Sequence, residues 1–353
     1  MNPLVADALA AAALVAIDPA GLGGVVVRSP HGADRDAWLA HLKHLLPAGT
    51  PQRRLPLNAG DTALLGGLDF SATLQTGKPV LHRGLLAQAH GGVVTLAMAE
   101  RTTPGVAARL AAVLDTGEVA LERDGLAQRL PARIGLVALD EGADDDEQMP
   151  AALRERLALR LDVQTMQGFA ALAIDPEDVE AARALLPQVQ ADDALAEALC
   201  SAAHALGVDS MRAPLQALRA ARAAAALDGR TQVTAQDAAL AARLVLSHRA
   251  TRLPPQAEAQ VEEQAAEDSG PPGEPPPATA DAAPPSSHAD ATPGDVGDPQ
   301  DLPQGELSER LVEAAQAAIP PGLLALLAMG ERLRGVDQSV HDPNLRRPSA
   351  CGP

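Results

Sequence analysis

The chain has 353 residues, of which 46% are apolar, and a formal net charge of −18. This length holds two or three ordinary domains with buried cores. With two Phe, one Trp and no Tyr, it lacks the aromatic platforms and the positive charge with which single-stranded nucleic acid is bound. Nucleic acid is therefore excluded as an expected partner.

The cysteines and the N-terminal apolar segment indicate a cytoplasmic protein. Cys200 and Cys351 suggest neither a disulfide framework nor a zinc site, and a reducing compartment is the default for such a chain. The apolar run Leu4–Ile17 contains Asp7 and is too short to cross a bilayer. We expect it to be the first helix of the fold, and we expect no integral membrane segment.

Residues 1–165 are predicted to form an α/β domain. Short apolar runs alternate there with helical stretches, which is typical of a parallel sheet covered on both faces. A helix is expected at Ala37–Leu46, and a hairpin at Glu118–Leu130 with its turn at residues 123–125. The predicted buried strands are Gly24–Arg28, Gly92–Met98, Ile134–Leu139 and Leu159–Val163.

Residues 166–253 are predicted to form a small helical domain. Apolar residues recur at helical spacing from Pro176 to Leu206. Thr234, with Asp237 three residues later, has the pattern of a helix start. An α/β domain followed by a helical lid is the AAA+ arrangement. The further helices expected in the lid are Met211–Leu227 and Thr234–His248.

The composition changes sharply after the lid. No Lys or Arg lies between Arg252 and Arg310, whereas 13 Asp or Glu do, together with repeated proline clusters. Such a segment cannot bury enough apolar surface to offset the entropy lost on ordering. We therefore expect residues 254–305 to be a disordered acidic linker, residues 306–335 a short helical segment, and residues 336–353 a disordered tail.

The eight residues after the first predicted strand occupy the place of a phosphate-binding loop. Such a loop needs glycines for close backbone approach, a Lys for the phosphates and a hydroxyl for magnesium. Ser29 and Asp34 stand at the two glycine positions, Arg35 at the lysine position and Asp36 at the hydroxyl position. The inner Gly32 remains. Taken alone, this stretch is better explained as an ordinary strand–helix connection.

A second nucleotide motif is also altered. The strand that ends near Leu96 should be followed by two acidic residues, one for the metal and one to activate water. Ala97 and Met98 stand there, and Glu100 comes two positions late. Strand alternation does not let Glu100 take their place. Two altered motifs at the right spacing predict an ATPase fold that has lost its own hydrolytic chemistry.

The segments that flank these motifs resemble the AAA+ modules of the magnesium chelatase family over about residues 1–250. The altered motifs are similar to the D type of subunit rather than to the I type, whose ATP motifs are intact. The matching segments are 18–25, 84–93, 114–118, 122–125, 131–133, 206–212, 218–222 and 246–249.

The resemblance implies a subunit of an enzyme that inserts Mg²⁺ into protoporphyrin IX in (bacterio)chlorophyll synthesis. In that family the I subunit hydrolyses ATP, the H subunit binds the porphyrin, and D forms a ring complex with I and couples it to H. We accordingly expect this chain to bind I and H without hydrolysing ATP itself. ATP and Mg²⁺ are expected at the interface with I, and this chain's own nucleotide site is doubtful.

The resemblance implies candidate functional roles for three arginines. Arg156 matches an arginine that acts in trans on a neighbour's nucleotide; an ordinary surface arginine is the alternative. Arg154 is the less favoured candidate for that role, because its alignment needs a one-residue insertion. Arg212 matches the lid arginine that senses nucleotide, and it is grouped with Gly32 and Arg35 in the degenerate nucleotide site; an ordinary solvated helix residue is the alternative.

Other readings remain open at the level of sequence. The acidic run at residues 144–147 is expected to be a solvated loop, so no metal site is predicted. D-type subunits carry a C-terminal integrin-I-like domain, which is not recognisable here; the motif-like residues 337–341 are interpreted as accidental. A truncated product or a fragment is therefore expected. The alternative functions are a self-sufficient MoxR-like remodelling ATPase and a free-standing scaffold.

Overall fold

The structure is a computed structural model that describes residues 3–123, 125–143, 147–163, 174–253 and 304–319, with Leu323, Leu324 and Leu327. The acidic linker, the C-terminal tail and most of the acidic run at 144–147, all expected from the sequence, lie outside these residues.

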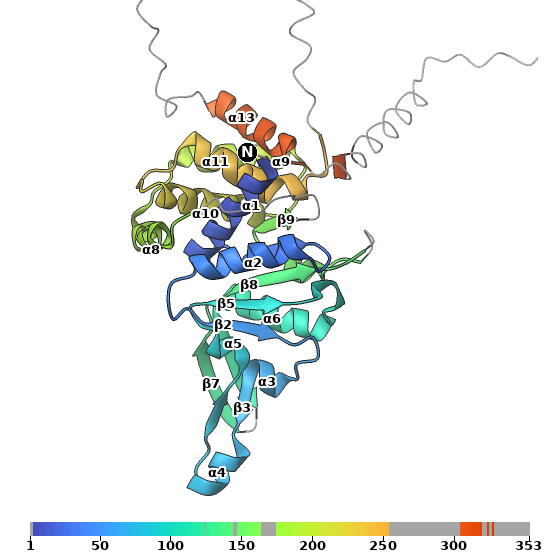
Figure 1. Cartoon of the computed structure of the whole chain (residues 1–353), viewed down its shortest axis with the longest axis vertical. Helices are drawn as coiled ribbons and strands as arrows, with labels where there is room; N and C mark the ends of the chain where they lie inside the picture. Colours follow the sequence, from blue (N-terminus) through green and yellow to red (C-terminus); the bar gives the residue numbers. More distant parts are fainter. Residues whose placement is uncertain are drawn as a thin grey trace, which may run out of the picture.

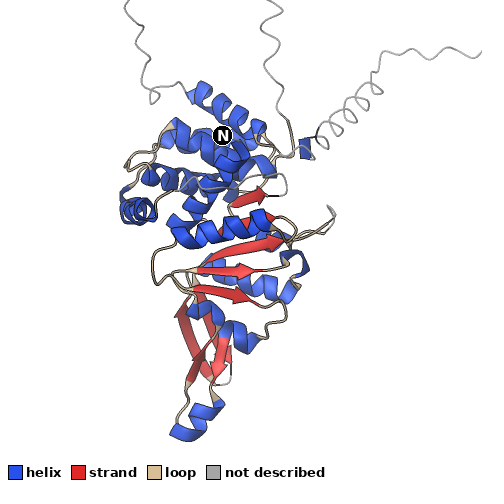
Figure 2. Cartoon of the chain, viewed as in Figure 1, coloured by secondary structure: helices blue, strands red, loops and turns tan. Residues whose placement is uncertain are grey.

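A five-stranded parallel sheet forms the centre of the first domain (Figures 1 and 2). Its spatial order is β2-β5-β8-β1-β9, and each neighbouring pair runs parallel. The sequence predicted four of these strands and missed β2, which carries only one buried residue. The strands are β1 (Gly24–Arg28), β2 (Gln52–Leu55), β5 (Val93–Leu96), β8 (Gly135–Asp140) and β9 (Leu159–Asp162).

Helices cover both faces of the sheet, as predicted. Side chains alternate along a strand, so Val25 and Val27 of β1 belong to one core cluster and Val26 to the other. The first cluster includes Trp38 of α2 (Ala33–Leu45), which is fully buried and donates its indole N–H to the carbonyl of Ala8 in α1 (Pro3–Ile17). The second includes α6 (Pro104–Thr116). This agrees with the AAA+ class.

Two antiparallel ribbons extend from the end of the first domain that lies toward the bottom of Figure 1. The hairpin β6 (Glu118–Arg123) and β7 (Leu126–Pro131) confirms the prediction, and Gly125 in its turn has φ +74°. The other ribbon was not predicted, because its strands are three residues long. Its elements, with the flanking helices, are α3 (Asp61–Leu65), β3 (Gly66–Leu68), α4 (Phe70–Thr76), β4 (Leu81–Arg83) and α5 (Leu85–Gln88).

The second domain is a helical bundle, as expected. Local signals set its helix starts: the Asp175 carboxylate accepts the Glu177 N–H before α8, and Thr234 and Asp237 form the expected capping box. The helical run from Pro176 is interrupted by the turn η2. The elements are α8 (Pro176–Leu185), η2 (Leu186–Gln188), α9 (Asp193–Ala205), α10 (Arg212–Leu227), α11 (Ala235–Ala241), the π-helical turn η3 (Ala242–Leu246) and η4 (Ser247–Arg249).

A further helix from the C-terminal side of the linker packs on this bundle (Figure 1). Helix α13 (Gln304–Ala317) contacts α9, α11 and η3. Leu307, Leu311 and Ala315 are buried there at intervals of four residues, the spacing of one helix face. The chain therefore returns to the lid after the linker. No helix within the described ranges is long and apolar enough to cross a membrane.

The lid is joined to the sheet along β9, where a histidine lies among arginines. The imidazole of His248 is partly buried, and its pKa is lowered well below its usual value, first by burial and then by the charges of Arg249, Arg160 and Arg154. Arg249 spans the boundary, because its guanidinium donates to the Leu157 carbonyl at 2.7 Å. His248 is therefore neutral in the folded chain.

Acidification is expected to destabilise the chain through His248. The unfolded chain takes up a proton near pH 6.5 that the folded chain does not accept. The free energy of unfolding should therefore keep this contribution above that pH and lose up to about 1.4 kcal/mol per pH unit below it. Urea unfolding between pH 7.5 and 5 measures the slope. His248→Gln should flatten it, and equal slopes in both proteins would refute a neutral His248.

Candidate functional site

The altered phosphate-binding loop lies at the carboxyl ends of the parallel strands. Helix α2 begins at Ala33 with Gly32 as its N-cap, four residues before the expected start. Asp34 and Asp36 therefore lie in its first turn, where carboxylates interact favourably with the helix dipole. A bound phosphate would use the same positive helix end, so these two side chains disfavour one by like charge.

Arg35, at the lysine position, is already paired. It is 4% exposed, and its Nη1 lies 2.7 Å from Oε1 of Glu141, the residue after β8. The Glu141 N–H in turn donates to Oε2 of Glu100 at 3.0 Å. The positive charge that a nucleotide would need here is thus neutralised by a carboxylate of the same chain.

Glu100 reaches this edge despite its late position in the sequence. Strand β5 ends at Leu96, and Met98 adopts the left-handed conformation with φ 48° before the turn η1 (Ala99–Arg101). The alternation argument does not apply, because the strand has already ended. Besides accepting the Glu141 backbone N–H, Glu100 lies with its Oε1 3.5 Å from Nε of Arg101. Over the described ranges no group of three His, Cys, Asp or Glu residues could hold a metal ion.

A cavity of about 120 Å³ lies at the amino ends of the strands, between the two domains. Four segments form it: the turn before β1, the end of α6, the connection before β9, and helix α10 of the lid. Its lining residues are Ala20, Gly21, Gly23, Leu114, Asp115, Arg156, Arg212, Leu215, Gln216 and Arg219.

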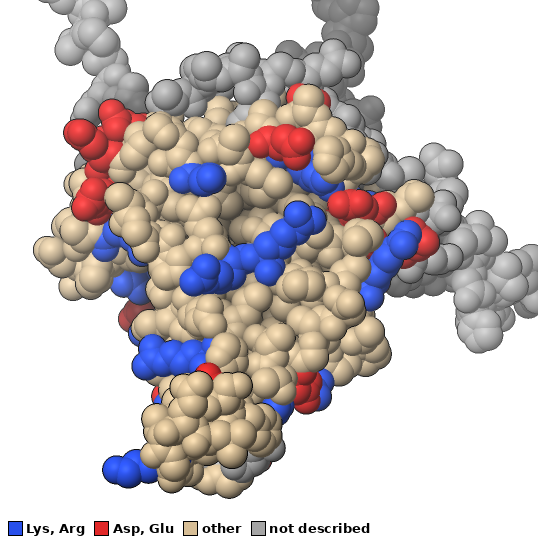
Figure 3. Space-filling view, turned by 60° about the horizontal axis from the view of Figure 1, so that its bottom comes forward, with Lys and Arg blue, Asp and Glu red and all other residues tan. Residues whose placement is uncertain are grey.

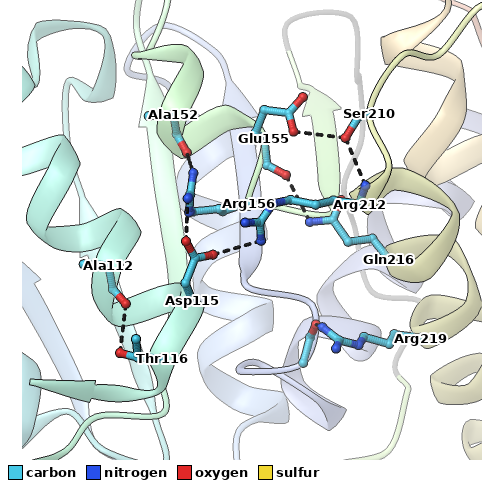
Figure 4. A network of polar contacts seen from close by, with 11 residues as sticks. Ala112, Asp115, Thr116, Ala152, Glu155, Arg156, Ser210, Arg212, Gln216 and Arg219 are labelled. Atoms are coloured by element: carbon cyan, nitrogen blue, oxygen red, sulfur yellow. Dashed lines mark hydrogen bonds and ion pairs between the residues drawn. The ribbon is translucent and has the colours of Figure 1, made fainter.

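Arg156 is held on the sheet side of this cavity (Figure 4). Its Nη1 donates to the Ala152 carbonyl at 2.6 Å and its Nη2 to Asp115 Oδ2 at 2.5 Å, while its Nε is buried and has no hydrogen-bond partner among the described residues. Gly23, with φ +68°, passes so close that a Cβ there would lie 2.2 Å from the Arg156 carbonyl oxygen. Only glycine fits this approach, so the turn before β1 helps to set the arginine's position.

Asp115 joins Arg156 to the lid. Its Oδ1 accepts a hydrogen bond from Arg212 Nη1 at 2.8 Å, so one carboxylate bridges two guanidinium groups (Figure 4). Burial raises the pKa of Asp115, but the hydrogen bonds and charges of Arg156 and Arg212 outweigh burial, and the pKa lies below its usual value. The carboxyl group is therefore ionised.

Further polar contacts tie the lid to the sheet around the cavity. Ser210 donates to the Glu155 carboxylate at 3.0 Å, and Gln216 donates to the Glu155 carbonyl at 3.2 Å. Arg219, two helical turns beyond Arg212, donates to the Gly21 carbonyl at 2.8 Å. The cavity is therefore built by both domains together.

The sequence-derived site residues fall into two places. Gly32 and Arg35 follow the carboxyl end of β1, whereas Arg156 and Arg212 lie beside its amino end. The four residue steps of β1 separate these edges by about 13 Å. The structure does not bring Arg212 to the loop at Gly32 and Arg35 but places it with Arg156. Arg154 lines no part of the cavity; its guanidinium bonds Gln148.

Sequence reasoning missed Asp115, Gln216 and Arg219 as members of this site. Asp115 and Arg219 stood within family-like segments, but nothing in those segments indicated that the two would meet.

Charge is distributed unevenly over the surface. Figure 3 shows a band of Lys and Arg side chains across one face of this acidic chain, with acidic side chains mostly toward its margins.

Comparisons with known proteins agree with the architecture. The family described as the AAA lid domain matches residues 196–268. The solved structure of a protein from Cytophaga hutchinsonii assigned as an ATPase superposes with a TM-score of 0.51 at 14% identity, covering 74% of this chain and 91% of that one. At that identity the likeness shows the fold alone.

Curated relatives are more informative. The magnesium-chelatase 60 kDa subunit of Cereibacter sphaeroides is 42% identical over 92% of this chain and 51% of its own length. The 67 kDa subunit of Chlorobaculum parvum is 33% identical over 68% of this chain and 42% of its own length. The chain thus spans about half the length of these relatives. The 38 kDa subunit of Rhodobacter capsulatus is 27% identical over 68% of this chain and 84% of its own length.

Proposed function

Because the chain belongs to the AAA+ subunits of the magnesium chelatase family, we propose that it is a D-type subunit that does not hydrolyse ATP. It assembles with the ATPase I subunit and completes the nucleotide site of that neighbour. Together with the porphyrin-binding H subunit, the assembly inserts Mg²⁺, as substrate, into protoporphyrin IX in the cytoplasm.

The observation that carries this proposal is the convergence of Arg156 and Arg212 at the edge of the sheet opposite the chain's own loop. A nucleotide at Gly32 would be about 13 Å away along β1, beyond direct contact with either guanidinium. An arginine supplied in trans can stabilise charge on a transferring phosphoryl group. The two arginines therefore suit a phosphate that a neighbouring subunit presents.

The residues of the chain's own loop do not fit ATP and Mg²⁺. Arg35 is buried in its ion pair with Glu141, and Asp36 stands at the position of the hydroxyl that would bind magnesium. Asp34 and Asp36 occupy the helix end that would otherwise attract phosphate. We assign no catalytic step to this loop. Gly32 and Arg35 belong to a nucleotide site in shape only.

The 38 kDa relative gives the proposal its partner. Such a subunit is 27% identical to this chain over 84% of its own length, which supports a related fold and the assembly of the two in one ring. When ATP·Mg²⁺ is bound by the neighbour, the metal and nucleotide supply the phosphoryl-transfer chemistry. This chain contributes Arg156 and Arg212, held in place by the Gly23 turn and by the end of α6.

The test is an ATPase assay with separate and mixed subunits. The purified chain alone is expected to show no ATP hydrolysis above background. Arg35→Ala should leave that rate of hydrolysis unchanged. Adding the chain to a 38 kDa-type ATPase should raise that subunit's turnover. Hydrolysis by the chain alone at an ordinary enzymatic rate would favour a self-sufficient, MoxR-like ATPase instead. Failure to bind or stimulate the ATPase subunit would also overturn the proposal.

A further inference from the structure

The cavity between the domains has an excess of positive charge. Three of its lining residues are arginines, and one, Asp115, is acidic. Arg156 and Arg212 share that single carboxylate. Within the described part of the chain Arg219 has no acidic partner, since its guanidinium bonds only the Gly21 carbonyl. Such a cluster can accept an anion of higher charge than one carboxylate.

The position of Asp115 is not explained by its helix. It lies next to the last residue of α6, which ends at Thr116 with Gly117 as a left-handed cap. A carboxylate at the carboxyl end of a helix is disfavoured by the helix dipole. The favourable contacts of Asp115 come from the two arginines, one on each domain.

Arg219 lies on the same side of α10 as Arg212, because seven residues make about two helical turns. Both line the cavity, and both residues are exposed. Most of the five N–H donors of Arg219 are thus available to a ligand that enters.

We propose that the cavity is a three-arginine phosphate site, formed by Arg156, Arg212 and Arg219, in which Asp115 takes the place of the phosphate while the chain is alone. The identification of that phosphate as part of a neighbour's nucleotide rests on the proposed function. The entering group displaces Asp115 and gains the donors of Arg219, which Asp115 does not use.

The exchange is physically reasonable. Asp115 is 30% exposed and Arg212 is 48% exposed at their side chains, and partly exposed ion pairs are weak because solvent screens them. A phosphate group carries more charge and more acceptor atoms than one carboxylate, and it can accept paired N–H donors from several guanidinium groups. Asp115 therefore keeps the arginines converged without sealing the site.

The experiment uses inorganic tripolyphosphate and the purified full chain, with binding followed by calorimetry. Asp115→Asn keeps the shape and removes the competing charge, so tripolyphosphate should bind roughly tenfold more tightly. Arg219→Ala should weaken binding roughly tenfold. Arg53→Ala, which removes an exposed charge from β2 on the far edge of the sheet, is the matched control and should leave the affinity unchanged.

A purely structural role for Asp115 would give the opposite sign, because loss of its bridges would disorder the arginines and weaken binding. The inference is overturned if Asp115→Asn binds tripolyphosphate no more tightly than the unmodified chain, or if Arg219→Ala binds it equally well. Asp115→Ala serves as a second variant, and thermal unfolding confirms that each protein is folded. If tripolyphosphate binding follows the expected pattern but the ATPase subunit is not stimulated, only the proposed function fails. If stimulation of the ATPase subunit depends on Arg156 but the affinity for tripolyphosphate is the same in the Asp115 and Arg219 variants as in the unmodified chain, only this inference fails.

Discussion

Replacement of Arg156 by alanine is expected to abolish the stimulation of a partner ATPase while leaving the chain folded. An arginine supplied in trans typically contributes ~10³-fold or more to phosphoryl transfer. The guanidinium is anchored by Ala152 and Asp115 at the cavity, so its loss removes the donor without opening the core. Steady-state ATP hydrolysis by the mixed subunits, at saturating concentrations of the variant, measures the effect.

The matched control is Arg154→Ala. Arg154 lies two residues away but bonds Gln148 and lines no part of the cavity, so that variant should still stimulate. Arg156→Lys should rescue little, because lysine lacks the planar pair of donors. Full stimulation by Arg156→Ala, or its loss in Arg154→Ala alone, would contradict the assignment and favour Arg154.

Replacement of Leu311 by aspartate is expected to give the largest loss of stability. Leu311 is fully buried where α13 packs on the lid. An unpaired carboxylate in that environment should either lower the free energy of unfolding by about 3 kcal/mol or more or detach the helix. Urea unfolding followed by circular dichroism measures the first outcome, and limited proteolysis after the lid detects the second.

Glu313→Ala, on the same helix but at an exposed position, is the control and should change stability little. If Leu311→Asp behaved like Glu313→Ala, α13 would not be docked in solution. The linker would then leave the lid without returning to it, and whatever follows α13 would be tethered only by the linker.

The local elements could be predicted because their causes lie close together in the sequence. Four apolar runs predicted β1, β5, β8 and β9, and the turn at Gly125 predicted the hairpin, since side-chain alternation and positive φ are properties of a few neighbouring residues. The capping box of Thr234 and Asp237 was readable for the same reason. Strand β2 was missed because an edge strand with one buried side chain has no apolar pattern.

The composition of the two sites was decided by the tertiary structure. Arg35 meets Glu141 across 106 residues, and Arg212 meets Asp115 across 97. The order of the strands and the position of the lid against the sheet bring these pairs together, and no local sequence pattern carries that information. The sequence by itself determined the AAA+ class and the loss of the phosphate-binding residues. Only the fold showed at which edge of the sheet each arginine lies, because the start and the end of β1 are on opposite sides of the domain.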